Sequence, residues 1–132
     1  MRAVDTNILV RLLTRDEPAQ YRTAVQFFED CRRIGEQVLI SAVVLCELVW
    51  VLKTNYGLSK DLVLIGLAKL EGLDGIVLES ADEVRTAIDQ WTSGRGDFAD
   101  YVIRLITASC GCSDFVTFDR ALTGAPGFTV LR

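Results

Sequence analysis

The chain has 132 residues, half of them hydrophobic and 24% charged, which predicts one globular domain over residues 1–132. It contains no histidine, which excludes histidine bases, histidine-paired nucleophiles and histidine-ligated metal sites. Without histidine, carboxylates are the most suitable groups for chemistry. The net charge of −4 counts against a basic nucleic-acid-binding surface.

Short apolar runs alternate with helical patterns along the whole chain. The runs predict strands at residues 2–4, 38–40, 75–78, 114–118 and 128–131. The 3.6-residue spacing of apolar side chains predicts helices at residues 7–14, 19–33, 42–56, 60–70, 81–91 and 97–109. Ser41, Ser59 and Ser80 stand where N-caps are expected. This alternation predicts an α/β sandwich with a mostly parallel sheet, in which ligands bind at the carboxyl ends of the strands.

Two aspartates directly follow predicted strands. Asp5 follows the first strand and Asp119 follows the fourth. Either one alone would be interpreted as a helix cap. Because both stand at the same predicted edge of the sheet, they become candidate site residues.

Glu47 lies in a predicted helix that is apolar nearly all round, so we expect it to be buried. No lysine or arginine lies within four residues of it. A buried carboxylate needs a cation or a metal, although an arginine far away in the sequence could also supply the charge.

Asp97 and Asp100 open the predicted helix before the fourth strand. They are three residues apart, with Arg104 four residues further on, so all three share one side of the helix. We expect Asp97 to cap the helix or assist, and Asp100 to be the ligand. The opposite assignment stays open, because helix boundaries are uncertain by a few residues.

Asp5, Glu47, Asp100 and Asp119 would converge without a basic partner, with Asp97 as a possible addition. Carboxylates this close need a counter-charge, and Mg²⁺ or Mn²⁺ is the divalent ion that prefers oxygen ligands. Such a site is suited to phosphodiester hydrolysis, because the metal can neutralise the phosphate and activate water.

The cysteines predict no metal or disulfide framework. Cys31 and Cys46 lie in apolar helical stretches, and Cys110-Gly-Cys112 lacks the spacing of a zinc or thioredoxin motif. We expect all four to be buried free thiols in a reducing compartment. Without a signal-peptide pattern or a long apolar segment, a cytoplasmic location without membrane association is expected.

The order of these motifs resembles that of PIN-domain ribonucleases, and in particular VapC-type toxins of type II toxin–antitoxin pairs. The matching stretches are Val4-Asp5-Thr6-Asn7, Ser41 followed by Glu47, Asp97-Phe98-Ala99-Asp100 and Thr117-Phe118-Asp119, and they span nearly the whole chain.

The resemblance implies a three-layer α/β/α sandwich with a central, mostly parallel five-stranded sheet. It implies Mg²⁺- or Mn²⁺-dependent endoribonuclease activity that leaves a 5′-phosphate. The family's four acids fall on Asp5, Glu47, Asp100 and Asp119. Polar residues that would orient these acids and the waters of the metal fall on Thr6, Asn7, Ser41 and Thr117. The resemblance also implies a homodimer and a cognate antitoxin protein as partners.

RNA binding would also need cations near the acids. Arg11, Arg104 and Arg120 are candidates for phosphate contacts, although each is more often a solvated surface charge. Without the four candidate acids, the remaining charges balance.

Other classes fit less well. A phosphatase would need a second aspartate two residues after Asp5, where Asn7 stands. A receiver-like signalling module would need paired acids after the first strand and a late lysine. A binding protein with purely structural acids would leave Glu47 unexplained.

Overall fold

The computed structural model describes all residues, 1–132, and divides the chain into two compact units, Met1–Glu79 and Ser80–Arg132. The first unit contains β1 (Arg2–Ala3), α1 (Thr6–Thr14), α2 (Pro18–Arg33), β2 (Val38–Ile40), α3 (Ala42–Thr54), α4 (Lys60–Glu71) and β3 (Ile76–Leu78). The second contains α5 (Ala81–Ser93), α6 (Phe98–Ser109), β4 (Phe115–Thr117), the 3₁₀ helix η1 (Arg120–Leu122) and β5 (Phe128–Val130).

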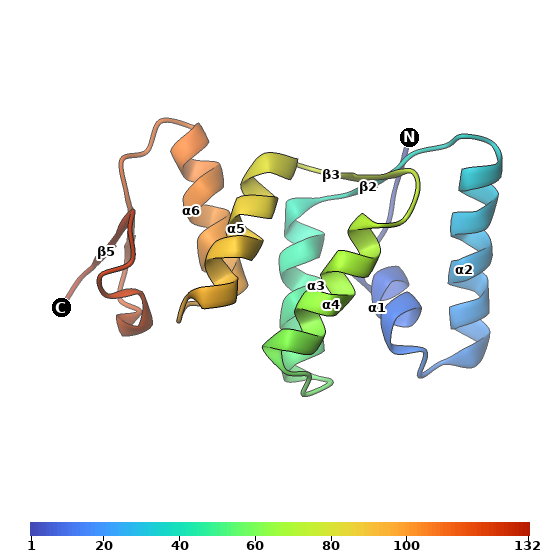
Figure 1. Cartoon of the computed structure of the whole chain (residues 1–132), viewed down its shortest axis with the longest axis horizontal. Helices are drawn as coiled ribbons and strands as arrows, with labels where there is room; N and C mark the ends of the chain where they lie inside the picture. The colour runs from blue at the N-terminus through green and yellow to red at the C-terminus, as the bar shows by residue number, and fades with distance from the viewer. The chain divides into compact units, whose positions relative to one another are not determined.

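The first unit is built on a three-stranded parallel sheet in the order β1-β2-β3. Helix α1 packs against both α2 and α3, and α3 also contacts α4 (Figure 1). The core includes Leu9 on α1, Ile40 on β2, Leu48 on α3 and Val63 on α4, all fully buried. Within α3 the buried residues Leu45, Leu48 and Leu52 recur at helical spacing, so this helix turns one stripe toward the core.

The second unit combines the pair α5 and α6 with a two-stranded parallel sheet, β4-β5 (Figure 1). Trp91 on α5 meets Phe98 on α6 edge to face, with ring centroids 5.6 Å apart. Tyr101 on α6 meets Phe128 on β5 in the same way, at 5.8 Å. These aromatic contacts form the core that supports the start of α6.

The predicted elements are confirmed to within about two residues at each end. The Ser41 and Ser59 caps are confirmed, since their hydroxyl oxygens accept hydrogen bonds from Val44 N–H at 3.1 Å and Leu62 N–H at 3.3 Å. Ser80 occupies the predicted cap position, but its side chain makes no capping bond and its φ is +50°. None of the helices has the length and apolar character needed to cross a membrane.

The predicted strands and their parallel direction are confirmed, but the strands do not form the single five-stranded sheet that was expected. The five strands form separate sheets of three and two strands. Every strand has only two or three residues, so each offers few ladder hydrogen bonds. Apolar runs predict where such strands begin and end, but they do not specify which strands pair.

Candidate functional site

Asp5 lies between β1 and α1 and caps the helix. Its Oδ1 accepts a hydrogen bond from Thr6 N–H at 2.7 Å, and the side chain is exposed. The hydroxyl of the neighbouring Thr6 is buried without a hydrogen-bond partner. The candidate acid and the cap are therefore the same residue, with one carboxylate oxygen used and one left available.

Glu47 is exposed, so the prediction that it is buried is wrong. Helix α3 buries Leu45, Leu48 and Leu52 on one face. On the opposite face Val43 is 75% exposed and Trp50 is 60% exposed, and Glu47 lies between them in sequence. A helix that is apolar on all sides gives no signal of which side faces the core. Desolvation is therefore no argument for a metal at Glu47.

Asp97 and Asp100 occupy the positions that the sequence predicts at the start of α6. Asp97 is the N-cap residue, and its N–H donates to Asp100 Oδ2 at 2.9 Å. The preceding Gly96 is buried, and its N–H donates to the Tyr101 hydroxyl at 3.0 Å. A side chain on Gly96 would collide with Leu122 and crowd Asp100. Side-chain and backbone contacts thus fix the turn that presents Asp100.

Asp119 follows β4 and caps η1. Its Oδ1 accepts from Ala121 N–H at 2.9 Å, and its own N–H donates to Thr117 Oγ1 at 3.0 Å. The Thr117 hydroxyl therefore holds the backbone of Asp119 and not its carboxylate. Asp119 itself is exposed.

The carboxyl group of Asp100 is electrostatically unfavourable as an anion. Partial burial raises its pKa, as do the negative charges of Asp97 and Asp119, while the Asp97 N–H hydrogen bond opposes the rise. No positive side chain forms an ion pair with Asp100. Asp100 and Asp119 thus lie near enough for their charges to interact, and a cation beside them would reduce the repulsion between them.

No three acidic or cysteine side chains form a ready metal-binding group. Asp5 and Glu47 belong to the first unit, and Asp97, Asp100 and Asp119 to the second. In Asp5, Asp100 and Asp119, one carboxylate oxygen binds a backbone N–H at a helix start. This use fixes the carboxylate and leaves its second oxygen for another ligand.

The remaining predicted polar residues differ in their roles. Ser41 Oγ is used to cap α3, and Asn7 is exposed at the start of α1. No hydrogen bond joins either side chain to a candidate acid. Their proposed effect on the waters of a metal comes from the resemblance alone.

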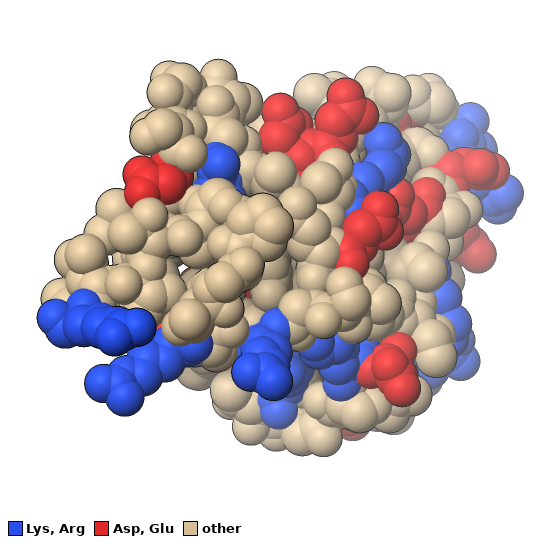
Figure 2. Space-filling model, turned by 60° about the vertical axis from the view of Figure 1, so that its left-hand side comes forward, with Lys and Arg blue, Asp and Glu red and all other residues tan.

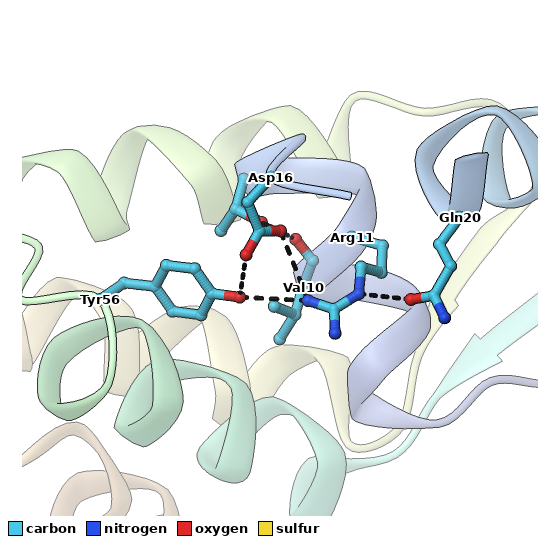
Figure 3. Close-up of polar contacts among 6 residues, drawn as sticks. Val10, Arg11, Asp16, Gln20 and Tyr56 are labelled. Atoms are coloured by element: carbon cyan, nitrogen blue, oxygen red, sulfur yellow. Dashed lines mark hydrogen bonds and ion pairs between the residues drawn. The ribbon is translucent and has the colours of Figure 1, made fainter. Parts of the chain in front are cut away.

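Arg11 is engaged within the first unit (Figure 3). Its Nε donates to Gln20 Oε1 at 2.6 Å, and its Nη1 donates to Tyr56 Oη at 3.1 Å and lies 3.4 Å from Asp16 Oδ1. Hydrogen bonds from the Thr14 and Tyr56 hydroxyls lower the pKa of Asp16, and the charge of Arg11 contributes. The network joins the end of α1 to the start of α2 and to the loop that follows α3.

Arg104 and Arg120 are placed very differently. The Nε and Nη1 atoms of Arg104 are buried without hydrogen-bond partners, and its Nη2 donates to Ser113 O at 3.4 Å. A side chain on Gly127 would collide with this guanidinium. Arg120 is exposed and, with Arg132, lines a surface cavity of about 340 Å³. Figure 2 shows both basic and acidic side chains on the face in view.

Two supporting residues were missed by the sequence analysis. The pattern assigns Tyr101 to the apolar face of its helix, which is right for the ring but overlooks the hydroxyl. Glu79 follows β3 and its Oε1 accepts from Ala42 N–H at 2.9 Å, so it helps to cap α3. The signal that identified Asp5 and Asp119, an acid directly after a strand, was also present at Glu79.

The cysteines divide into two pairs. Cys31 is buried and Cys46 is half-buried, and burial raises the pKa of the Cys46 thiol to about 11. Cys110 and Cys112 are exposed, so the prediction that they are buried is wrong. They lie beyond the last turn of α6, where the apolar pattern of the helix no longer applies.

A separate cavity of about 580 Å³ lies on the first unit among α1, α2 and the end of α4. Its walls are mainly apolar and include Leu12, Val25, Phe28 and Leu73. None of the candidate acids lines it.

A known family and a known protein match most of the chain. The family model described as "PIN domain" matches residues 2–126 and therefore extends across both units. A VapC ribonuclease of Aquifex aeolicus (strain VF5) is 25% identical over 120 residues, which cover 91% of this chain and 88% of the relative.

Proposed function

Because the chain belongs to the PIN-domain family, we propose that it is a Mg²⁺- or Mn²⁺-dependent endoribonuclease and the toxin of a toxin–antitoxin pair. The similarity to a VapC ribonuclease supports the choice of RNA as substrate. The observation that supports metal dependence is the position of Asp100, a partly buried carboxyl within electrostatic reach of two other aspartates and without an ion-pair partner. We further propose that residues 1–132 act as a single PIN domain, in agreement with the range of the family match.

The donor set fits a hard divalent cation. In this proposal Asp5, Asp100 and Asp119 hold the metal, Glu47 orients its waters or contributes to a second metal, and Asp97 assists. All are oxygen donors, which Mg²⁺ and Mn²⁺ prefer. When bound, the cation would neutralise charge on the phosphodiester and lower the pKa of a coordinated water.

The chain's own residues supply orientation. The Thr6, Ala121 and Asp97 N–H groups each hold one oxygen of a carboxylate. Fixed carboxylates bind a metal more tightly than mobile ones, because less side-chain freedom is lost on binding. Thr117 supports Asp119 in this role, and we assign Thr6, Asn7 and Ser41 to the surroundings of the metal on the resemblance.

Among the candidate arginines, Arg120 is best suited to bind an RNA phosphate. It is exposed, follows Asp119 directly and lines a cavity. The guanidinium of Arg11 is engaged by three side chains, and that of Arg104 is largely buried. We therefore propose substrate contact for Arg120, and support of the fold for the other two.

A cleavage assay tests the activity. Purified protein is incubated with end-labelled structured RNA, with Mg²⁺ or Mn²⁺ and then with excess EDTA. We expect internal cuts that require the metal and stop with EDTA. Cleavage that persists in EDTA, or no cleavage of any structured RNA, would contradict the proposal. Uptake of label from acetyl phosphate would instead indicate a receiver-like module.

Asp5→Asn tests the assignment of the site. Asparagine caps helices as well as aspartate does, so the helix start should be kept while the charge is lost. We expect metal-dependent cleavage to disappear while the circular dichroism spectrum and melting temperature stay close to those of the wild type. Asp61→Asn, an exposed acid on α4, is the matched control and should cleave normally.

The partners are proposed on the same basis. We expect a homodimer and an antitoxin protein that suppresses cleavage. Size-exclusion chromatography with light scattering tests the dimer. Co-expression with the product of the adjacent reading frame tests the antitoxin, which should co-purify with this chain and stop RNA cleavage.

A further inference from the structure

Cys110 and Cys112 are the cysteines of this chain that reagents in solution can reach. Both are exposed, whereas Cys31 is buried and burial raises the pKa of Cys46. Reactivity of cysteine requires access and a thiolate, so Cys31 and Cys46 are poor nucleophiles. The exposed pair is separated by a single residue, Gly111.

The backbone reverses direction between the two cysteines. Gly111 has a φ of +97°, and its N–H donates to Ala108 O at 3.0 Å. The N–H of Cys112 donates back to Thr107 O at 3.1 Å. This pair of bonds is the Schellman motif, which ends a helix with a left-handed residue. Cys110 is the last residue before the reversal and Cys112 the first after it.

The reversal of the backbone favours a disulfide between the two cysteines. A disulfide needs Cα atoms about 4.4–6.8 Å apart. In an extended strand, residues two apart are near or beyond the upper limit, because each Cα–Cα step is about 3.8 Å. A turn at the intervening residue shortens that separation.

We propose that Cys110 and Cys112 form a redox-active dithiol that closes reversibly to an intramolecular disulfide by exchange with a low-molecular-weight disulfide such as oxidised glutathione. One cysteine thiolate attacks a sulfur of the oxidant, whose S–S bond breaks and releases one thiol. The second cysteine attacks the mixed disulfide and releases the second thiol. The protein loses two electrons and two protons, and both pass to the two released thiols.

The geometry makes this disulfide a labile one. It closes a ring across three residues, so it removes little chain entropy from the unfolded state and contributes little stability. Exposed disulfides of this kind are easily reduced and are usually regulatory or catalytic. Oxidation would tie the end of α6 to the segment that leads into β4. This disulfide exchange requires no nuclease activity.

The proteolytic map of the chain gives a direct test. Trypsin cuts after Arg104 and Arg120, so peptide 105–120 contains Cys110 and Cys112 and neither of the other cysteines. The reduced protein is equilibrated without oxygen in mixtures of reduced and oxidised glutathione, quenched with acid, alkylated and digested. We expect the mass of the peptide from oxidised protein to be two hydrogen atoms below that of the unmodified dithiol peptide. This peptide should carry no glutathione or alkyl group.

Single variants and a denatured sample complete the test. Cys110→Ser and Cys112→Ser should each stop at a mixed disulfide with glutathione, whereas Cys46→Ala should close as the wild type does. In denaturant, the equilibrium constant for closure should fall about tenfold, because the turn no longer holds the thiols together. Glutathione adducts without an internal disulfide, disulfide-linked dimers, or equal closure in denaturant would overturn the proposal.

Discussion

In the unit Met1–Glu79 the candidate acids are held singly, Asp5 at the start of α1 and Glu47 on the exposed face of α3. In the unit Ser80–Arg132, Asp100 is partly buried and lies within the electrostatic reach of Asp97 and Asp119. Water can stabilise the first two charges, whereas the ionised form of Asp100 is disfavoured by its own surroundings. Acidic side chains are thus separate and exposed in one unit, and grouped with one of them partly buried in the other.

The largest expected effect is the difference in cleavage rate between variants of Asp100 and of Glu47. Asp100→Asn keeps an oxygen for the Asp97 N–H but removes a charged ligand, so the single-turnover rate should fall by more than about 100-fold, the upper range for groups outside the ligand sphere. Glu47→Gln, on an exposed face, should cost about tenfold. Asp89→Asn, an exposed acid on α5, is the control and should be unaffected. Equal losses for Asp100→Asn and Glu47→Gln would contradict the different roles assigned to these two acids.

The next effect concerns the turn that presents Asp100. Tyr101→Phe keeps the ring contact with Phe128 but leaves the buried Gly96 N–H without its partner. The free energy of unfolding should fall by about 1–3 kcal/mol, the usual cost of such a group. Urea unfolding measures the change. A loss below about 0.5 kcal/mol would mean that water or a shift of the turn replaces the hydroxyl.

A smaller effect should have the opposite sign. In EDTA at neutral pH, Asp100→Asn should raise the free energy of unfolding by about 0.5 kcal/mol, a figure reduced for solvent screening. Because the pKa of Asp100 is raised in the folded state, its unfavourable contribution is absent well below the ordinary value of 3.8. The contribution grows as the pH rises through the folded pKa.

Thermal melts across pH, with and without Mg²⁺, test this sign. The advantage of Asp100→Asn should vanish in acid, and Mg²⁺ at neutral pH should stabilise the wild type more than the variant. A variant less stable than the wild type at neutral pH in EDTA would show that the ionised carboxylate is favourable in its place.

The smallest expected effect lies in the first unit, at Asp16, whose hydrogen-bond partners lower its pKa. Tyr56→Phe removes one of the hydroxyls that lower the pKa of Asp16, so this pKa should rise toward its ordinary value. The stability from Asp16 is present at neutral pH and is lost as pH falls through the lowered pKa, so the variant should differ least in acid. NMR titration of the carboxyl group measures the shift. Tyr21→Phe, whose ring stacks with Arg15, should leave the Asp16 pKa unchanged.

Much of the fold follows from local patterns in the chain. Apolar spacing and caps such as Ser41 and Ser59 place the helices, because these interactions form within a few residues. Strand pairing depends on contacts between distant segments, and the division into two sheets was not predictable from short apolar runs. The exposure of Glu47 was missed for a related reason, because α3 is apolar on the side that faces the core and on the side that does not.

The candidate site was predictable where an acid follows a strand or opens a helix. Asp5, Asp97, Asp100 and Asp119 all occupy the positions expected of them along the chain. The supporting contacts were not predictable, because the Tyr101 hydroxyl and the Gly96 N–H are joined only by the tight geometry of one turn. The burial of the Arg104 guanidinium likewise depends on Gly127, 23 positions later in the chain.

The aspartates that accept backbone hydrogen bonds at helix starts have a consequence for how this protein can change. At Asp5, Asp100 and Asp119, the hydrogen bond from the backbone N–H requires only an oxygen acceptor, whereas the proposed chemistry requires a negative charge. Asparagine satisfies the first demand and fails the second, whereas alanine fails both. A lineage that acquires asparagine here would keep a folded protein with its surface intact. It could then silence the chemistry without losing whatever else that surface binds.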